Sequence, residues 1–166
     1  LEQFMKYADL DEETARQAVT FYRERYSVTG IFENHPYDGI KEVLETLENK
    51  GYILAVSSSK PEYFVEKVLE HFDMTKYFKV VVGSEMNGGR TKKADVIEET
   101  LRRLHMENHR DQVIMVGDKE HDVFGAKQAG VSCVAVSYGY GTMEELVNAE
   151  PLQIVNSPAQ LLDFFC

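Results

Sequence analysis

The chain has 166 residues, and its 18 Lys and Arg against 28 Asp and Glu give a formal net charge of −10. This length holds one domain, or one domain with a small appendage. With 43% hydrophobic and 11% aromatic residues the chain can bury a core, which argues against disorder. The acidity argues against nucleic acid as the main partner, because neutralising a phosphate backbone needs clustered Lys and Arg.

No features point to a membrane or to secretion. No apolar run approaches the ~20 residues of a bilayer span, and residues 1–6 lack the basic-then-apolar pattern of a signal peptide. Two cysteines, Cys133 and Cys166, cannot build a disulfide framework. Cys133 stands in an apolar run, so we predict a small buried hydrophobe there. We therefore expect a cytoplasmic protein.

The first part of the chain predicts helices. Residues 11–27 have helical spacing of apolar side chains and a capping Asp11. A connector over residues 28–38 leads to a second amphipathic helix over residues 39–50, which Gly51 ends.

From residue 52 onward, short apolar runs alternate with amphipathic helices. The predicted strands are residues 52–56, 80–82, 113–116, 131–136 and 154–155. One helix is predicted to start at residue 61, and three more are predicted over residues 92–104, 121–129 and 158–165. Fully apolar strands between helices indicate a parallel sheet that is covered on both faces. We predict a Rossmann-like α/β core over residues 31–166 and a separate helical element over residues 1–30.

Polar side chains follow these strands at one end. Ser57–Lys60 follow the first strand, Gly83–Glu85 follow the second, and Asp118 follows the third, with Asp122 one turn later. Ligands bind beyond the carboxyl ends of parallel strands. Serine hydroxyls at a helix start suit phosphate oxygens, two carboxylates suit Mg²⁺, and a lysine neutralises a phosphoryl group.

Each of these groups also has a purely structural interpretation. The serines can cap a helix, Asp118 and Asp122 can serve as a cap and a first-turn acid, and Lys93 can be a solvated charge beside Lys92. The five histidines lack metal-ligand spacing. Their joint placement at strand ends favours the phosphate and metal interpretation for Ser, Lys and the two Asp.

Three segments resemble motifs two, three and four of the haloacid dehalogenase-like phosphatases, in the phosphoglycolate phosphatase and 5′-nucleotidase branch with a helical cap. They are residues 54–61 (Leu-Ala-Val-Ser-Ser-Ser-Lys-Pro), 89–97 (Gly-Arg-Thr-Lys-Lys-Ala-Asp-Val-Ile) and 116–122 (Val-Gly-Asp-Lys-Glu-His-Asp). The resemblance runs over essentially the whole chain. It implies a partial helical cap over residues 1–30 and a haloacid dehalogenase-like core over residues 31–166.

The resemblance also implies roles for single residues. Ser58 would bond the transferring phosphoryl group, Ser59 would line the phosphate pocket, and Lys93 would neutralise phosphate and nucleophile. Asp118 would bind Mg²⁺, and Asp122 would hold the ion directly or through water. The implied reaction is hydrolysis of a small phosphorylated metabolite, phosphoglycolate-like or a nucleotide, through an aspartyl-phosphate.

The chain departs from this family at the nucleophile, which should lie in a strand-ending Asp-x-Asp-Gly-Thr motif. Residues 9–11 read Asp-Leu-Asp, but no apolar strand precedes them and Glu-Glu-Thr follows them. The resemblance thus implies a family member without its first strand and nucleophile, N-terminally truncated and inactive as given. In the family that strand lies between the strands that end at Ser57 and Gly117, so its absence leaves unpaired backbone edges.

Three outcomes stay open for these edges: another segment fills the gap, the sheet rearranges, or the chain self-associates. Two functions also stay open, a Mg²⁺-dependent phosphatase and a non-catalytic α/β module that binds phosphate or a protein. A receiver-like signalling domain fits less well, because Asp118 would be its one candidate phospho-acceptor.

Overall fold

The computed structural model describes residues 5, 8–86 and 88–166. The start of the predicted cap and most of the stretch tested for a signal pattern, residues 1–4 and 6–7, lie outside the described residues. Contacts divide the chain into two compact units, one up to His35 and one from Pro36 onward. No helix among the described residues has the length and apolar composition needed to cross a bilayer.

The first unit is built on helix α2 (Glu12–Val28), followed by a short 3₁₀ turn, η1 (Gly30–Phe32). The Asp11 carboxylate caps α2 by accepting the backbone N–H of Thr14 at 2.9 Å. The helix predicted from residue 11 onward is therefore confirmed, with its cap.

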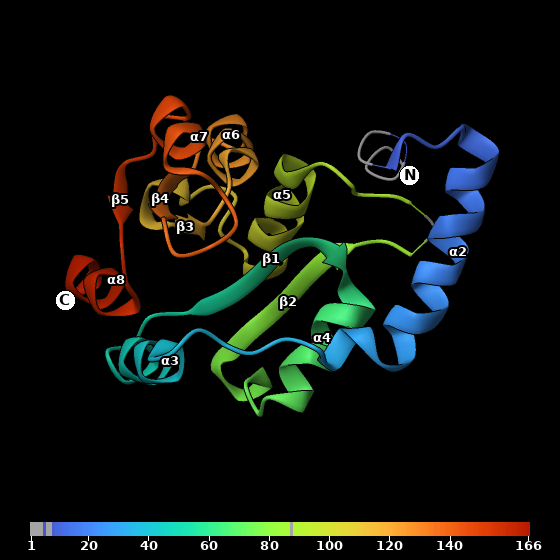
Figure 1. Cartoon of the computed structure of the whole chain (residues 1–166). Coiled ribbons are helices and arrows are strands. Elements are labelled where there is room, and N and C mark those ends of the chain that lie inside the picture. Colours follow the sequence, from blue (N-terminus) through green and yellow to red (C-terminus); the bar gives the residue numbers. More distant parts are fainter. Residues whose placement is uncertain (1–4, 6–7, 87) are drawn as a thin grey trace. The chain divides into compact units, whose positions relative to one another are not determined.

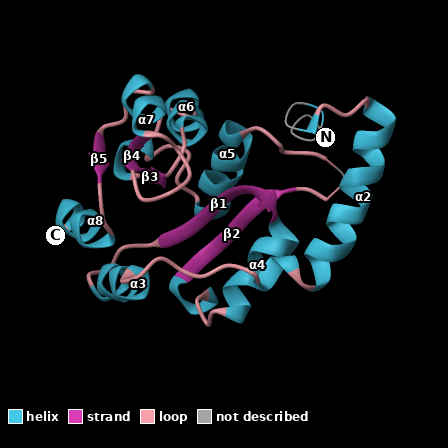
Figure 2. Ribbon diagram, viewed as in Figure 1, coloured by secondary structure: helices cyan, strands magenta, loops and turns pink. Residues whose placement is uncertain are grey.

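The second unit alternates strands and helices (Figures 1 and 2). Its strands are β1 (Leu54–Pro61), β2 (Phe78–Ser84), β3 (Ile114–Gly117), β4 (Ser132–Val136) and β5 (Gln153–Val155). Its helices are α3 (Ile40–Asn49), α4 (Glu62–His71), α5 (Lys93–Leu104), α6 (Glu120–Gln128), α7 (Met143–Asn148) and α8 (Pro158–Phe165), with 3₁₀ turns η2 (Thr75–Tyr77) and η3 (Arg110–Gln112). The α/β fold predicted from the apolar runs is confirmed.

The strands form two separate parallel sheets rather than one. β1 pairs with β2, with Val56 opposite Val81, and β3, β4 and β5 pair in that order. Among the described residues β1 has no strand neighbour besides β2, and β3 has none besides β4. The division falls between the strands that carry Ser57 and Gly117, which is where the family resemblance implied a missing strand.

Helices cover both faces of these sheets. Helices α5, α6 and α7 lie on one side and helices α3, α4 and α8 on the other (Figure 1). Successive residues of β4 alternate between the two layers: Cys133 and Ala135 pack with α5–α7, and Val134 and Val136 pack with α3 and α8. The core therefore lies on both faces of the strands, as fully apolar strands require.

The two sheets share an apolar cluster although no hydrogen bonds join them. Leu54 of β1 packs in the same cluster as Ile114 and Val116 of β3, around Val43 and Leu47 of α3. We call this group, with Leu161 of α8, the shared cluster. It holds the ends of β1 and β3 on one common layer of helices.

Candidate active site

The centre of the candidate site is an ion pair between α5 and α6. The ammonium nitrogen of Lys93, at the start of α5, lies 2.7 Å from Oδ1 of Asp122, in the first turn of α6. The two side chains are only 13% and 9% exposed. A pair so shielded from water is far stronger electrostatically than a surface pair, but costs desolvation energy.

The second carboxylate oxygen of Asp122 fixes the end of β3. Oδ2 accepts the backbone N–H groups of Asp118 and Lys119, each at 3.0 Å. A Cβ at Gly117 would lie 2.2 Å from the Cβ of Asp122, so a glycine is needed for this close approach. Asp122 thereby ties the carboxyl end of β3 to α6 and to Lys93.

Lys93 reaches this position past Gly125 of α6, where an added Cβ would lie 2.5 Å from the Lys93 Cγ. Its ammonium also donates to the carbonyl oxygen of Ser57 in β1, at 3.1 Å. One cation thus bridges the carboxyl ends of β1 and β3. Lys92, its neighbour in the chain, is exposed.

The three serines after the apolar part of β1 differ in their surroundings. The Ser57 hydroxyl oxygen is buried and has no hydrogen-bond partner among the described residues. The Ser58 hydroxyl accepts the backbone N–H of Lys60 at 3.1 Å, and Ser59 is exposed. The strand predicted to stop at Ser57 runs on to Pro61, with irregular pairing between Ser57 and Pro61. The hydrophobic pattern of the sequence did not predict that the Ser57 hydroxyl would be buried.

Asp118 faces the loop after β4. Its Oδ2 accepts the backbone N–H of Tyr140 at 2.8 Å. A Cβ at Gly139 would lie 2.4 Å from that oxygen, and one at Gly141 would lie 2.2 Å from the Asp118 carbonyl oxygen. The two glycines of the turn at residues 138–141 therefore allow its backbone to lie close against Asp118.

Two tyrosines border this loop. The rings of Tyr37 and Tyr138 meet edge to face, with centroids 5.1 Å apart. Burial raises the pKa of the Tyr37 phenol, and the charge of Asp118 raises it further. Tyr37 therefore lies close enough to Asp118 for the carboxylate charge to raise the pKa of its phenol.

A second charged network holds the segment before Lys93. Glu62, at the start of α4, accepts two hydrogen bonds from Arg103, at 2.9 and 3.1 Å, and one from the backbone N–H of Gly83 at 3.2 Å. Its carboxylate also lies 3.6 Å from Arg90, which bonds Glu85 at 2.7 Å. Glu62 thus connects the Ser57–Pro61 segment to the loop that leads to Lys93, a role the sequence did not signal.

The net effect of these contacts is a lowered pKa for the Glu62 carboxyl. Burial opposes ionisation, but the hydrogen bonds and charge of Arg103, the Gly83 N–H and the charge of Arg90 together outweigh it. Glu62 is therefore an anchoring carboxylate rather than an acid.

The donor set fits a hard divalent cation. Asp118 directly follows β3 and Asp122 lies in the first turn of α6, although no three His, Cys, Asp or Glu side chains gather in the described part of the chain. Mg²⁺ needs only one or two protein carboxylates, because waters and substrate phosphate complete its shell. Both Asp122 oxygens are already engaged, which favours Asp118 as the direct ligand.

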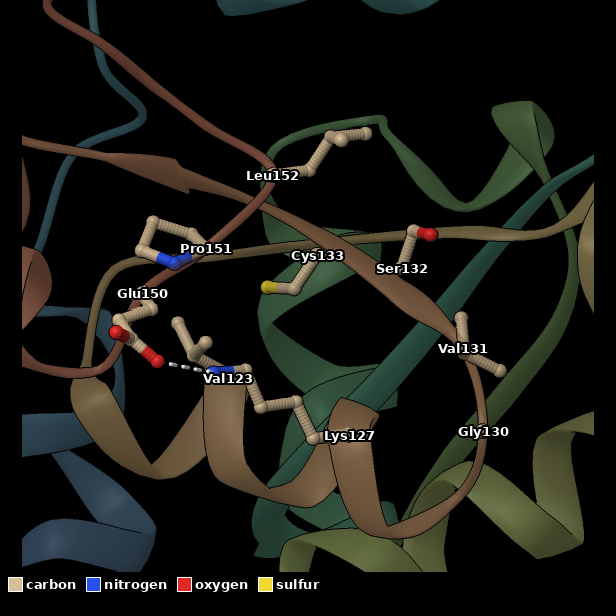
Figure 3. A pocket seen from close by; sticks show the side chains of 9 residues that line it. All are labelled: Val123, Lys127, Gly130, Val131, Ser132, Cys133, Glu150, Pro151 and Leu152. Carbon is tan, nitrogen blue, oxygen red and sulfur yellow. Dashed lines mark ion pairs between the residues drawn. The ribbon is translucent and has the colours of Figure 1, made fainter.

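A separate hollow of about 380 Å³ lies at the opposite end of β4 (Figure 3). It is lined by Val123, Lys127, Gly130, Val131, Ser132, Cys133, Glu150, Pro151 and Leu152. Lys127 and Glu150 pair across its rim at 3.5 Å. Since ligands of parallel sheets bind at the carboxyl ends of strands, this hollow lies away from the candidate site.

The structure thus brings Lys93, Asp122 and the backbone of Asp118 and Ser57 together at the carboxyl ends of β1 and β3. Within the described residues, no hydrogen bond joins the side chain of Ser58 or Ser59 to Lys93, Asp118 or Asp122.

The chain is similar to known proteins. The sequence profile of the haloacid dehalogenase-like hydrolases matches residues 1–136. A 5′-nucleotidase of Pseudomonas aeruginosa is 40% identical over 151 residues, which are 91% of this chain and 67% of that protein. A phosphoglycolate phosphatase of Vibrio vulnificus is 35% identical over 158 residues, which are 93% of this chain and 67% of that protein.

A solved structure repeats the fold. The crystal structure of a predicted phosphatase from Clostridium acetobutylicum is 41% identical and superposes with a TM-score of 0.91. The match covers 99% of this chain and 75% of that chain. This chain thus spans two thirds to three quarters of the length of these relatives, and it belongs to the family of haloacid dehalogenase-like hydrolases.

Proposed function

We propose that this chain carries the phosphate- and Mg²⁺-binding part of a phosphatase that acts on a small phosphomonoester, phosphoglycolate-like or a nucleotide. The observation that carries the proposal is the position of the Lys93 ammonium between the Ser57 carbonyl and the Asp122 carboxylate. Relatives with the names 5′-nucleotidase and phosphoglycolate phosphatase support the substrate class.

The serine segment supplies hydrogen bonds to the phosphoryl group. The Ser58 oxygen accepts the Lys60 N–H, and a hydroxyl that accepts one bond still has its proton to donate. Ser59 adds an exposed hydroxyl in the same segment of β1, just before the start of α4. Lys93 places a positive charge beside this segment, where it stabilises negative charge on a transferring phosphoryl group.

Asp118 and Asp122 hold Mg²⁺ in this proposal, with Asp118 as direct ligand and Asp122 as its support. When bound, the ion neutralises phosphate charge and orients the phosphoryl group. The hydrogen bonds from Asp118 N–H and Lys119 N–H keep the Asp122 carboxylate in place, and the bond from Tyr140 N–H orients the Asp118 carboxylate.

The reaction needs a carboxylate nucleophile that these 166 residues do not provide in an Asp-x-Asp-Gly-Thr motif. A carboxylate oxygen attacks phosphorus, an acyl phosphate forms, and the bond from phosphorus to the alcohol oxygen breaks as that oxygen takes up a proton. Water then hydrolyses the acyl phosphate, which releases inorganic phosphate and regenerates the carboxylate. The chain alone should therefore bind phosphate with Mg²⁺ but turn over nothing.

Thermal unfolding with inorganic phosphate and Mg²⁺ tests the proposal. A ligand that binds the folded state raises the melting temperature, so we expect a rise for the wild type and none for Asp118→Asn. Asp163→Asn, on the exposed face of α8, is the matched control and should keep the rise.

Two other results are informative. No shift in the wild type favours the second candidate, a non-catalytic interaction module, which the missing nucleophile motif supports. Turnover of p-nitrophenyl phosphate that Asp118→Asn abolishes would contradict the claim that the nucleophile lies outside the chain.

A further inference from the structure

Three tyrosines gather beside Asp118 at the carboxyl end of β4. Tyr138 and Tyr140 belong to the loop that follows this strand, and Tyr37 stands just before α3. The rings of Tyr37 and Tyr138 meet edge to face. Burial raises the pKa of the Tyr37 phenol, and the charges of Asp118 and Tyr140 raise it further, so both groups lie near this phenol. We call these three residues the tyrosine rim.

The rim is open to solvent although its backbone is held in place. Tyr140 is 85% exposed and Tyr37 is 44% exposed. The Tyr140 N–H nevertheless donates to Asp118 at 2.8 Å, and the glycines on both sides of Tyr140 lie close against Asp118. Tyr138 packs against the shared cluster and supports the Tyr37 ring. The rim therefore presents ordered aromatic surface to solvent next to Asp118.

This chemistry favours a planar, uncharged ligand group. Aromatic side chains stack on the flat faces of nucleobases, and such stacking adds substantially to affinity. Phenol hydroxyls both donate and accept hydrogen bonds, as the polar edges of a base and the hydroxyls of a sugar require. A small carboxylate needs a cation instead, and no hydrogen bond or cation–π contact joins the rim to a Lys or Arg among the described residues.

We propose that the tyrosine rim binds the leaving group of the substrate, and that this group is a nucleoside or a similar planar ring rather than a small carboxylate such as glycolate. The inference rests on the proposed function, because that function places the phosphoryl group beside Asp118. Tyr140 stacks on the ring of the ligand, and Tyr37 adds a second aromatic wall and a phenol hydroxyl.

A purely structural role accounts for Tyr138 but not for Tyr140. Tyr138 contributes to the shared cluster, whereas a ring that is 85% exposed adds little to the stability of the fold. Tyr140→Ala should therefore leave the melting temperature nearly unchanged. This makes the variant a clean probe of ligand binding.

Calorimetric titration of the whole chain with Mg²⁺ tests the proposal. The ligands are adenosine 5′-monophosphate, ribose 5-phosphate, which lacks the base, and phosphoglycolate. We expect the nucleotide to bind about tenfold more tightly than either of the other two, because only the nucleotide has a ring to stack. Equal affinities for the nucleotide and ribose 5-phosphate, or tighter binding of phosphoglycolate, would overturn the proposal.

Substitutions at Tyr140 locate the effect. Tyr140→Ala should weaken nucleotide binding by about tenfold and leave ribose 5-phosphate binding unchanged, and Tyr140→Phe, which keeps the ring, should bind both as the wild type does. Tyr52→Ala is the matched control, since Tyr52 is 43% exposed and lies just before β1, at the opposite end of the strands. A full preference for the nucleotide in Tyr140→Ala, or the same loss in Tyr52→Ala, counts against the rim.

Adenosine, which has no phosphate, separates this inference from the proposed function. Saturation-transfer NMR should detect adenosine on the wild type and a weaker signal on Tyr140→Ala. Adenosine binding that depends on Tyr140, without any binding of inorganic phosphate, would support the rim as a base-binding surface and count against the proposed function. Phosphate binding that Asp118→Asn abolishes, without any preference for the base, would do the reverse.

Discussion

Asp122 binds Lys93 through one carboxylate oxygen and the backbone of Asp118 and Lys119 through the other. A single buried side chain thus links α5, β3 and α6. Because the pair is shielded from water, removal of either partner leaves an uncompensated charge.

Lys93→Met and Asp122→Asn should each lower the free energy of unfolding by about 3 kcal/mol. The double variant should cost clearly less than the two single losses together, because each residue's main partner is already gone. Urea denaturation of the four proteins measures this coupling. Additive losses would mean that the 2.7 Å contact contributes nothing in solution.

Gly125→Ala should destabilise the chain, although alanine has a higher helix propensity than glycine. Alanine in a helix interior is normally about 1 kcal/mol more favourable than glycine, but the new Cβ would lie 2.5 Å from Lys93 Cγ. Gln128→Ala, exposed on the same helix, is the control and should be nearly neutral. A stabilised Gly125→Ala protein would show that Lys93 does not run past this position.

Glu62→Gln should loosen the loop before Lys93. The change weakens bonds to Arg103, Arg90 and the Gly83 N–H, so we expect faster hydrogen exchange at Gly83 and a loss of about 2 kcal/mol in the free energy of unfolding. Glu99→Gln is the control, since Glu99 also binds Arg103 but contacts neither Arg90 nor Gly83 in the described contacts. Equal exchange at Gly83 in both variants would contradict the anchoring role.

The Glu99 carboxyl should also make the free energy of unfolding depend on pH. Hydrogen bonds from Arg102 and Arg103 lower the pKa of its carboxyl from 4.5 to about 2. A lowered pKa in the folded state adds stability that is complete above pH 4.5 and is lost as the pH falls toward 2. Denaturation at about pH 6 and about pH 3 should show a smaller difference between wild type and Glu99→Gln at the lower pH. A constant difference would rule out this linkage.

The two cysteines should differ in reactivity. Burial raises the pKa of the Cys133 thiol to about 12, and the charge of Asp122 adds to the rise, whereas Cys166 is exposed. Because the thiolate is the reactive form, iodoacetamide should add once to the folded chain and twice after unfolding. Intact mass measures the additions. Two rapid additions to the folded chain would show that Cys133 is accessible.

Much of the fold follows from the sequence, because each strand contains a short apolar run. The runs over residues 113–116 and 131–136 are short and apolar, as expected of buried strands. Their predicted bounds agree with those of β3 and β4 to within one residue. Helix α7 was not predicted, since its six residues include two glutamates and no long apolar face. Its start was nevertheless marked, by the Thr142 and Glu145 capping box.

The site was less accessible to sequence reasoning. The sequence pattern places Lys93, Asp118 and Asp122 near the same edge of the sheet. It cannot decide which of the two aspartates forms the ion pair with Lys93. It also cannot show which hydroxyl of Ser57 and Ser58 turns inward, because the irregular end of β1 breaks the strict alternation of side chains. Glu62 lacks any local signal, since its partners come from β2, α5 and a loop.

The shared cluster has a consequence for how the chain loses its structure. Leu54, Ile114 and Leu161 pack in one cluster although they lie on β1, β3 and α8, so neither sheet is a separate cooperative unit. Melting of the carboxyl-terminal helix would expose apolar side chains of both sheets at once. We therefore expect that loss of α8, more than a hundred residues away in the chain, would also destabilise the serine-containing strand β1.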